Sequence, residues 1–80
     1  MALSKTQEKE KKAVQQRFGK RLAELRNARG ITQERLSFNL KVDRTYVSYI
    51  ERGERNPSLY LLWRIAKALK VPLADLTDVK

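Results

Sequence analysis

Apolar residues recur every three or four positions along this chain, and this spacing limits the fold more than any other feature. The clearest run is Val14, Phe18, Leu22 and Leu25. Side chains three or four residues apart lie on one face of an α-helix, whereas a strand needs sustained alternation, which this sequence lacks. The pattern therefore predicts an all-α protein.

Residues that favour helix ends divide this pattern into five short helices. The first is expected to end at Arg29, because Gly30 has no Cβ and can adopt a left-handed backbone. The residues expected to cap the next three helices are Thr32, Asp43 and Ser58. The helices predicted after them span 33–40, 44–52 and 59–70, and a short fifth over 73–76 follows Pro72. Short helices with brief connections predict a compact five-helix bundle.

The first 13 residues differ from the rest because they offer no apolar face. Ser4 is a suitable N-cap, but residues 5–13 are almost wholly polar and rich in lysine. A helix with no face to bury is marginal in water. Residues 1–13 are therefore predicted to be a basic polar arm or a frayed extension of the first helix, and residues 14–80 to be the folded domain.

The composition narrows the function. The 80 residues suit one domain, and 18 Lys and Arg against 9 Asp and Glu give a formal charge of +9. This charge favours nucleic acid as a partner over an anionic membrane or a merely solvated basic surface. Because Cys and His are absent, we expect no metal, no cofactor and no enzyme. The lack of a signal peptide and of a long apolar run predicts a cytoplasmic protein without membrane contact.

The predicted helix 44–52 has two contrasting sides. The apolar side, expected to face the core, holds Tyr46, Val47 and Ile50. The other side carries Arg44, Thr45, Ser48, Tyr49 and Arg52. Hydroxyls beside an arginine suit a helix that enters the major groove, where Arg binds guanine and Thr or Ser contacts any base edge. An ordinary polar face is the alternative.

Helix, tight turn and helix follow one another here, as in the helix-turn-helix motif. The segment ITQERLSFNLKVDRTYVSYIERGERNPSLYLLWRIAKALKVPLADL resembles the lambda-repressor/Cro-like (XRE) helix-turn-helix family, and the likeness covers residues 16–76. Its specific parts are the T-Q-E-x-L opening, the I-E-x-G ending and the N-P-S-L before the next helix. Within the family, DRTYVSYIERGERNPSL is particularly similar to controller proteins of restriction–modification systems.

The resemblance implies roles for individual residues. The base-reading positions of the family fall on Arg44, Thr45, Ser48 and Tyr49. Gln33 matches a position that binds a phosphate. Arg26 and Glu51 match a pair that orients the recognition helix. The turn after that helix is expected to lie along the DNA backbone and to add phosphate contacts from Arg52, Arg55 and Asn56.

The fourth predicted helix carries more apolar residues than one buried face needs. Exposed aromatic side chains on a small domain mark an interface. We expect a two-fold dimer surface formed by Tyr60, Trp63, Pro72, Leu73 and Leu76. The alternative is that Trp63 folds over a small core.

The sequence therefore predicts a dimeric, sequence-specific transcription regulator that binds double-stranded DNA at a two-fold symmetric operator. No small-molecule ligand is expected, and the narrower resemblance implies the controller role. The alternative is a helix-turn-helix protein-interaction module, such as an antitoxin, that binds a protein partner through Tyr60 and Trp63.

Overall fold

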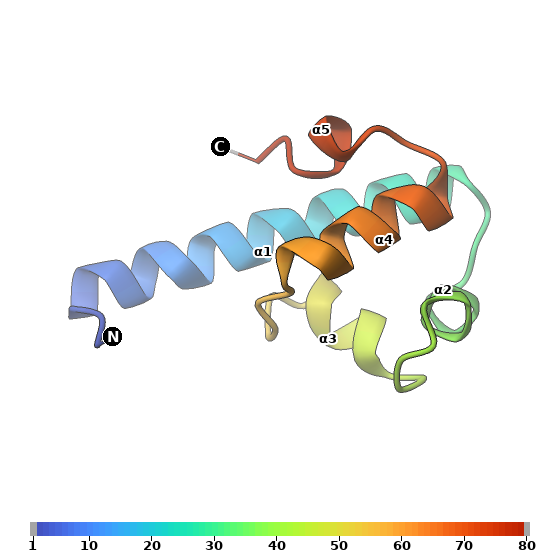
Figure 1. The fold of residues 1–80 in the computed structure, drawn as a ribbon. Helices are drawn as coiled ribbons and strands as arrows, with labels where there is room; N and C mark the ends of the chain where they lie inside the picture. Colours follow the sequence, from blue (N-terminus) through green and yellow to red (C-terminus); the bar gives the residue numbers. More distant parts are fainter. Residues whose placement is uncertain (1, 80) are drawn as a thin grey trace.

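The computed structural model describes residues 2–79, which form five α-helices and no strand. The helices are α1 (Lys5–Ala28), α2 (Gln33–Leu40), α3 (Tyr46–Glu51), α4 (Leu59–Leu69) and α5 (Leu73–Leu76). Figure 1 shows that the N-terminal part of the long α1 extends beyond the other four helices. The prediction of an all-α, five-helix bundle is confirmed. The predicted segments were 1–13 and 14–80. Met1, which begins the first, and Lys80, which ends the second, lie outside the described residues.

Local signals start two helices at the predicted residues, and α1 ends at Ala28, one residue before the predicted Arg29. The Thr32 hydroxyl accepts a hydrogen bond from the Arg35 N–H at 3.0 Å, and the Ser58 hydroxyl accepts one from the Leu61 N–H at 3.1 Å. Gly30 has a φ of 67°, the left-handed conformation expected after the last turn of α1. These caps depend on neighbouring residues only, so they are readable from the sequence.

Helix α3 begins two residues later than predicted. Asp43 does not cap a helix over 44–52, because its Oδ1 accepts hydrogen bonds from the Thr45 N–H at 3.0 Å and from the Thr45 hydroxyl at 2.7 Å. These bonds form an Asx turn, which competes with the helix for the same backbone. Arg44 and Thr45 therefore lie in a turn, and α3 starts at Tyr46. The predicted start at residue 44 is wrong.

The polar N-terminal segment continues helix α1. Ser4 and Gln7 form a capping box, in which the Ser4 hydroxyl accepts the Gln7 N–H at 3.2 Å and the Gln7 side chain accepts the Ser4 N–H at 2.9 Å. Residues 5–13 are the first turns of the helix in the structure. A domain boundary after residue 13 stays a prediction. None of the helices in residues 2–79, α1 included, combines the length and apolar character needed to cross a membrane.

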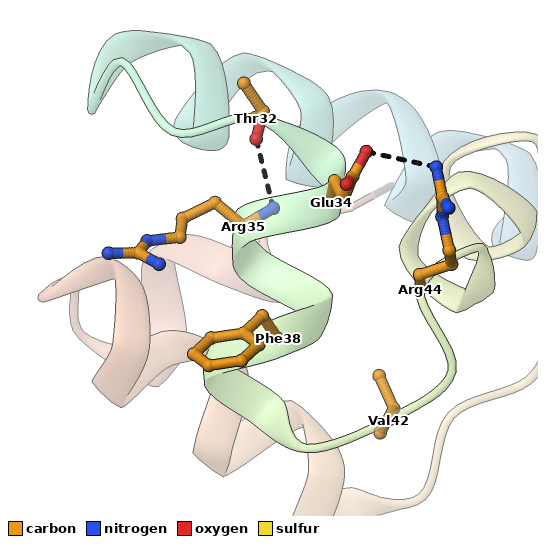
Figure 2. Close-up of a pocket in the computed structure, with 6 residues that line it drawn as sticks. All are labelled: Thr32, Glu34, Arg35, Phe38, Val42 and Arg44. Carbon is orange, nitrogen blue, oxygen red and sulfur yellow. Dashed lines mark hydrogen bonds and ion pairs between the residues drawn. The ribbon is translucent and has the colours of Figure 1, made fainter.

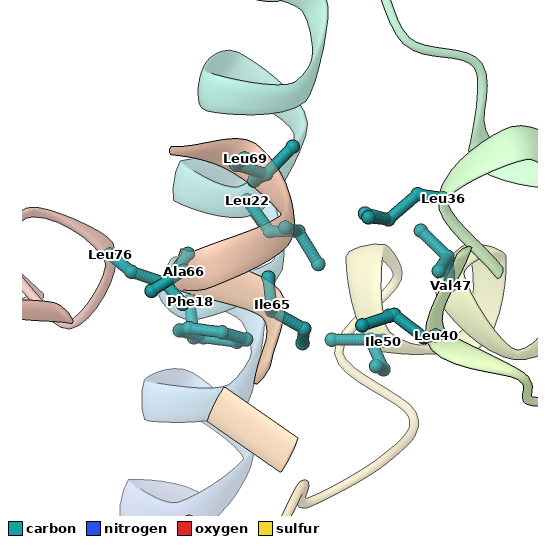
Figure 3. Close-up of a cluster of buried hydrophobic side chains, with 10 residues drawn as sticks. All are labelled: Phe18, Leu22, Leu36, Leu40, Val47, Ile50, Ile65, Ala66, Leu69 and Leu76. Atoms are coloured by element: carbon teal, nitrogen blue, oxygen red, sulfur yellow. The ribbon is translucent and has the colours of Figure 1, made fainter. Parts of the chain in front are cut away.

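Every helix contributes to one apolar core, in which the side chains point toward one another (Figure 3). Its buried members are Phe18, Leu22, Leu36, Leu40, Val47, Ile50, Ile65, Ala66, Leu69 and Leu76. Helix α3 has six residues, too few for a stable helix on its own. Burial of Val47 and Ile50, at about 1.5–3 kcal/mol for each such side chain, holds it in place.

Gly19 allows α1 and α3 to approach closely. A Cβ at this position would overlap the backbone carbonyl oxygens of Ile50 and Glu51. Only glycine fits here without moving the last turn of α3 away from α1. Gly19 therefore serves the close packing of α1 against α3.

Candidate nucleic-acid interface

A buried ion pair joins the end of α3 to α1. Arg26 donates from Nε and Nη2 to the two carboxylate oxygens of Glu51 at 2.6 and 3.0 Å. The side chains are only 11% and 7% exposed. Arg26 Nη1 also donates to the backbone oxygen of Ile31 at 2.8 Å. Because two parallel hydrogen bonds are directional, this pair sets the rotation of α3 as well as its position.

Gln33 joins the same cluster from the first turn of α2. Its Nε2 donates to Glu51 Oε1 at 2.8 Å, so helices α1, α2 and α3 meet at one carboxylate. The sequence did not predict this bond, because the two residues are 18 positions apart and only the tertiary fold brings them together. The phosphate contact assigned to Gln33 stays a prediction.

A second set of contacts fixes the turn between α2 and α3. The buried Ser37 hydroxyl accepts a hydrogen bond from the Val47 N–H at 3.3 Å, and the Ser37 carbonyl accepts one from the Val42 N–H at 3.1 Å. Lys41 closes α2 with a left-handed φ of 58°. Helix α3 is thus held against α2 on its inner side, and its outer side is left to solvent.

The predicted base-reading residues lie at the start of α3 and on its outer side. Arg44 and Thr45 are exposed in the turn before the helix, and Ser48 and Tyr49 are half-buried on the helix itself. The structure therefore brings all four to one region of the surface. Their contact with bases stays a prediction.

Arginines of the following turn surround Ser48 and Tyr49. Arg52 Nη1 donates to the Ser48 hydroxyl at 2.7 Å. The guanidinium carbons of Arg52 and Arg55 lie 4.8 and 4.5 Å from the centroid of the Tyr49 ring. A hydrogen bond to Glu54 raises the pKa of Arg52 above its usual range. The residues of this turn that are predicted to contact phosphates are all exposed, namely Arg52, Arg55 and Asn56.

A groove of about 590 Å³ lies between α2 and the turn before α3 (Figure 2). Its lining residues are Thr32, Glu34, Arg35, Phe38, Val42 and Arg44. Glu34 and Arg44 point toward each other, with Oε2 and Nη2 3.5 Å apart. Phe38 is exposed on the outer side of α2, and the centroid of its ring lies 5.6 Å from the Arg35 guanidinium carbon. The pairing of Glu34 with Arg44 was missed, because it depends on the geometry of the turn.

The residues predicted for a dimer surface are not all exposed. Tyr60 and Trp63 are 67% and 47% exposed and stack with their ring centroids 6.1 Å apart. Pro72 is exposed and Leu73 is half-buried. Leu76 is fully buried in the core, so its assignment to an interface is wrong. Helix α5 packs on α1 and α4 and buries the Leu76 side chain in the core. This burial depends on tertiary packing, so the sequence pattern did not indicate it.

Two helices joined by a tight turn, the second fixed by buried contacts and free on its outer side, define a helix-turn-helix protein. A family model described as helix-turn-helix (HTH_3) matches residues 22–76. The chain belongs to this HTH_3 helix-turn-helix family. The family predicted from the sequence is therefore confirmed.

Similar proteins include several named as controllers. Control protein C.BamHI from Bacillus amyloliquefaciens is 44% identical over 62 residues, which cover 76% of this chain and 76% of that protein. Control protein C.MunI from Mycoplasma sp is 41% identical over 61 residues, or 75% of this chain and 82% of that protein. The crystal structure of the restriction-modification controller protein C.AhdI from Aeromonas hydrophila has a TM-score of 0.77 and 45% identity, and the match covers 81% of this chain and 94% of that one.

Proposed function

We propose that this chain is a sequence-specific transcription regulator that binds double-stranded DNA through α3. The observation that carries the proposal is a polar surface made of the exposed Arg44 and Thr45, in the turn before α3, and the half-buried Ser48 and Tyr49, on a helix that buried contacts hold in place. A recognition helix needs both properties, since a base contact discriminates only if the side chain is positioned in advance. The charge of +9 adds attraction to phosphates, and the relatives named as control proteins support a regulatory role.

Two groups of residues share the contact in this proposal. The base-reading group is Arg44, Thr45, Ser48 and Tyr49. The phosphate-binding group is Gln33, Arg52, Arg55 and Asn56. Gln33 can keep its bond to Glu51 while it binds a phosphate, because its amide nitrogen carries a second N–H. The buried Arg26–Glu51 pair orients the helix and contacts no base.

Selection of bound sequences from a random pool of double-stranded DNA tests this function. We expect an enriched motif with two-fold symmetry, whose half-sites are read by one α3 each. A pool without any enriched motif would contradict sequence-specific binding. An enriched motif without symmetry would leave specific binding in place and contradict reading by a dimer.

We also propose that the chain acts as a homodimer, with an interface built around Tyr60 and Trp63 of α4. The support is the exposure of the two stacked aromatic rings. The exposed Pro72 and the half-buried Leu73 stay part of the predicted surface. Guanidinium and ammonium groups flank these rings, since Arg64 lies 5.9 Å from the Tyr60 centroid and Lys67 lies 4.9 Å from the Trp63 centroid. Such amphipathic aromatics can pack at the centre of an interface while their cations stay at its solvated rim.

Trp63→Glu tests the dimer surface. A charge inside an apolar interface loses its hydration, so we expect a folded monomer in sedimentation and a large loss of affinity for the full operator. Phe38→Glu is the matched control for the sedimentation measurement alone, because it also puts a charge on an exposed aromatic position but on α2, in the groove that Arg44 lines. If the Trp63→Glu protein stays dimeric, the interface lies elsewhere.

The finer role we propose is that of a cytoplasmic controller of a restriction–modification system, working without cofactor, catalysis or small-molecule ligand. It rests on the similarity to C.BamHI, C.MunI and C.AhdI. If this role is correct, the DNA motif selected from the random pool should occur upstream of restriction and modification genes that neighbour the gene of this protein. Reporter fusions of those promoters that fail to respond to the protein would contradict the role.

The exposed Tyr60–Trp63 stack also fits a protein-interaction module, such as an antitoxin that binds a protein partner. Salt separates the two functions. Binding through several phosphate contacts weakens steeply as salt rises, whereas an aromatic protein interface responds little.

A further inference from the structure

The N-terminal turns of α1 carry a row of lysines on one side. Lys5, Lys9 and Lys12, which we call the lysine row, are spaced by four and three residues and therefore share one face of the helix. Gln16 continues the same face four residues after Lys12. The capping box at Ser4 and the unbroken helix make this row one continuous surface in the structure.

The direction of the lysine row is fixed by the turn that follows α3. Gln16 lies so close to Gly53 that a Cβ on Gly53 would overlap its side chain, and Gln15 Nε2 donates to the Gly53 carbonyl at 2.9 Å. Of the row, Lys12 reaches this turn, and Lys9 and Lys5 follow it on the same side of α1 toward the N-terminus. Lys12 and Arg55 accordingly line one shallow groove of about 390 Å³.

The charges in that groove favour an anion. Its charged lining residues are Glu8, Lys11, Lys12, Glu54 and Arg55. Glu54 is already bonded to Arg52, so it is partly neutralised. The lysine row extends the positive charge along α1, away from the turn that we assign to phosphate contacts. Because the row offers no apolar side chain, it does not suit insertion into a membrane surface.

We propose that the lysine row is a second binding site for the phosphate backbone of double-stranded DNA, outside the helix-turn-helix and continuous with Arg55. This inference rests on the proposed DNA-binding function. Lys5 and Lys12 are about 10 Å apart along the helix at 1.5 Å per residue, which equals about three base-pair steps of 3.4 Å. The row lies outside residues 22–76, which the family model matches, so it extends the contact that the family segment makes.

The test compares two variants that lose the same charge from the same helix. Lys9→Gln/Lys12→Gln removes two members of the row, and Arg17→Gln/Lys20→Gln removes two exposed cations that line a separate groove beside Asp78 and Val79. Glutamine favours helix about as well as lysine, so circular dichroism should show both variants folded as the full chain is. Affinity for the selected operator is measured over a range of salt concentrations, with and without flanking base pairs.

We expect the slope of log affinity against log salt to become shallower by about 0.9 for each phosphate that the protein no longer neutralises, so by about 2 for the lysine-row variant. The control variant should keep the slope of the full chain. The difference should disappear on an operator trimmed of its flanks. Equal slopes for the two variants would overturn the inference and leave the proposed function intact, whereas a full chain with no salt-dependent DNA binding would overturn both.

Discussion

Two of the Arg–Glu pairs at helix α3 share their chemistry but not their surroundings. The inner pair, Arg26 and Glu51, is bidentate and almost fully buried. The outer pair, Arg44 and Glu34, makes one contact at 3.5 Å, with side chains that are 76% and 68% exposed. The inner pair joins α1 to α3, whereas the outer pair joins α2 to the turn before α3.

The difference in burial decides what each pair can do. A buried charge that loses its partner has no water to replace it, so the inner pair is a permanent part of the fold. An exposed pair contributes at most about 1 kcal/mol, because water and salt screen it. Arg44 can therefore leave Glu34 for a base at little cost. The inner pair joins α3 to α1, whereas the outer pair leaves Arg44 available for the base contact that we propose.

The largest expected effect follows from breaking the inner pair. Glu51→Ala leaves the Arg26 guanidinium buried without a carboxylate and also removes the acceptor of Gln33. We expect the free energy of unfolding to fall by about 3–5 kcal/mol, measured by urea denaturation. Glu54→Ala, which removes an exposed carboxylate from the turn after α3, should change it by less than about 1 kcal/mol.

A double substitution separates the buried charge from the loss of packing. Arg26→Met/Glu51→Leu replaces both charges with apolar side chains, and we expect it to be more stable than Glu51→Ala alone. DNA affinity should nevertheless stay low if the pair fixes the rotation of α3. If Glu51→Ala unfolds at the same urea concentration as the unchanged protein, the inner pair does not hold the helix.

The outer pair should show the reverse behaviour. Arg44→Ala is expected to change the free energy of unfolding by less than about 1 kcal/mol, yet to cost about 1–3 kcal/mol of operator binding and to alter the preferred base at one position of each half-site. Arg55→Ala should weaken binding to all sequences alike. Equal losses on specific and non-specific DNA for Arg44→Ala would show that Arg44 does not read a base.

Removing the carboxylate of the outer pair should have a smaller effect of the opposite sign. Glu34→Gln keeps the shape of the side chain and removes a negative charge beside Arg44. Because that charge repels phosphates, we expect all DNA to bind a few-fold more tightly at low salt, with the gain lost at high salt. Weaker binding of the operator by Glu34→Gln would mean that Glu34 positions Arg44 for its base.

The sequence predicted those features that depend on near neighbours in the chain. Thr32, Ser58 and Gly30 set helix ends through contacts within a few residues, and all three were identified. The features that depend on tertiary packing were missed or misassigned. Leu76 was placed at a surface because its neighbours in space were unknown, and the bond from Gln33 to Glu51 joins helices distant in sequence.

The start of α3 shows a third kind of failure, in which two local signals compete. Asp43 is a good helix cap and also a good Asx-turn residue, and the sequence does not decide between them. The Asx turn prevails here, and it keeps Arg44 outside the helix and exposed. The exposure of the outer pair, and with it the contrast between the two pairs, therefore depends on this turn.

The smallest expected effect tests that turn through the pKa of Asp43. The hydrogen bond from the Thr45 hydroxyl lowers this pKa most, and the bond from the Thr45 N–H lowers it further. Both bonds favour the charged carboxylate. Their contribution to stability is therefore lost as the pH falls through the lowered pKa. Thr45→Val removes the hydroxyl and keeps the N–H, so the pKa should rise part of the way toward its ordinary value in an NMR titration. Ser48→Ala, which leaves both bonds in place, should not shift it. An unchanged pKa in Thr45→Val would mean that the hydroxyl does not hold the turn, and that the exposure of Arg44 has another cause.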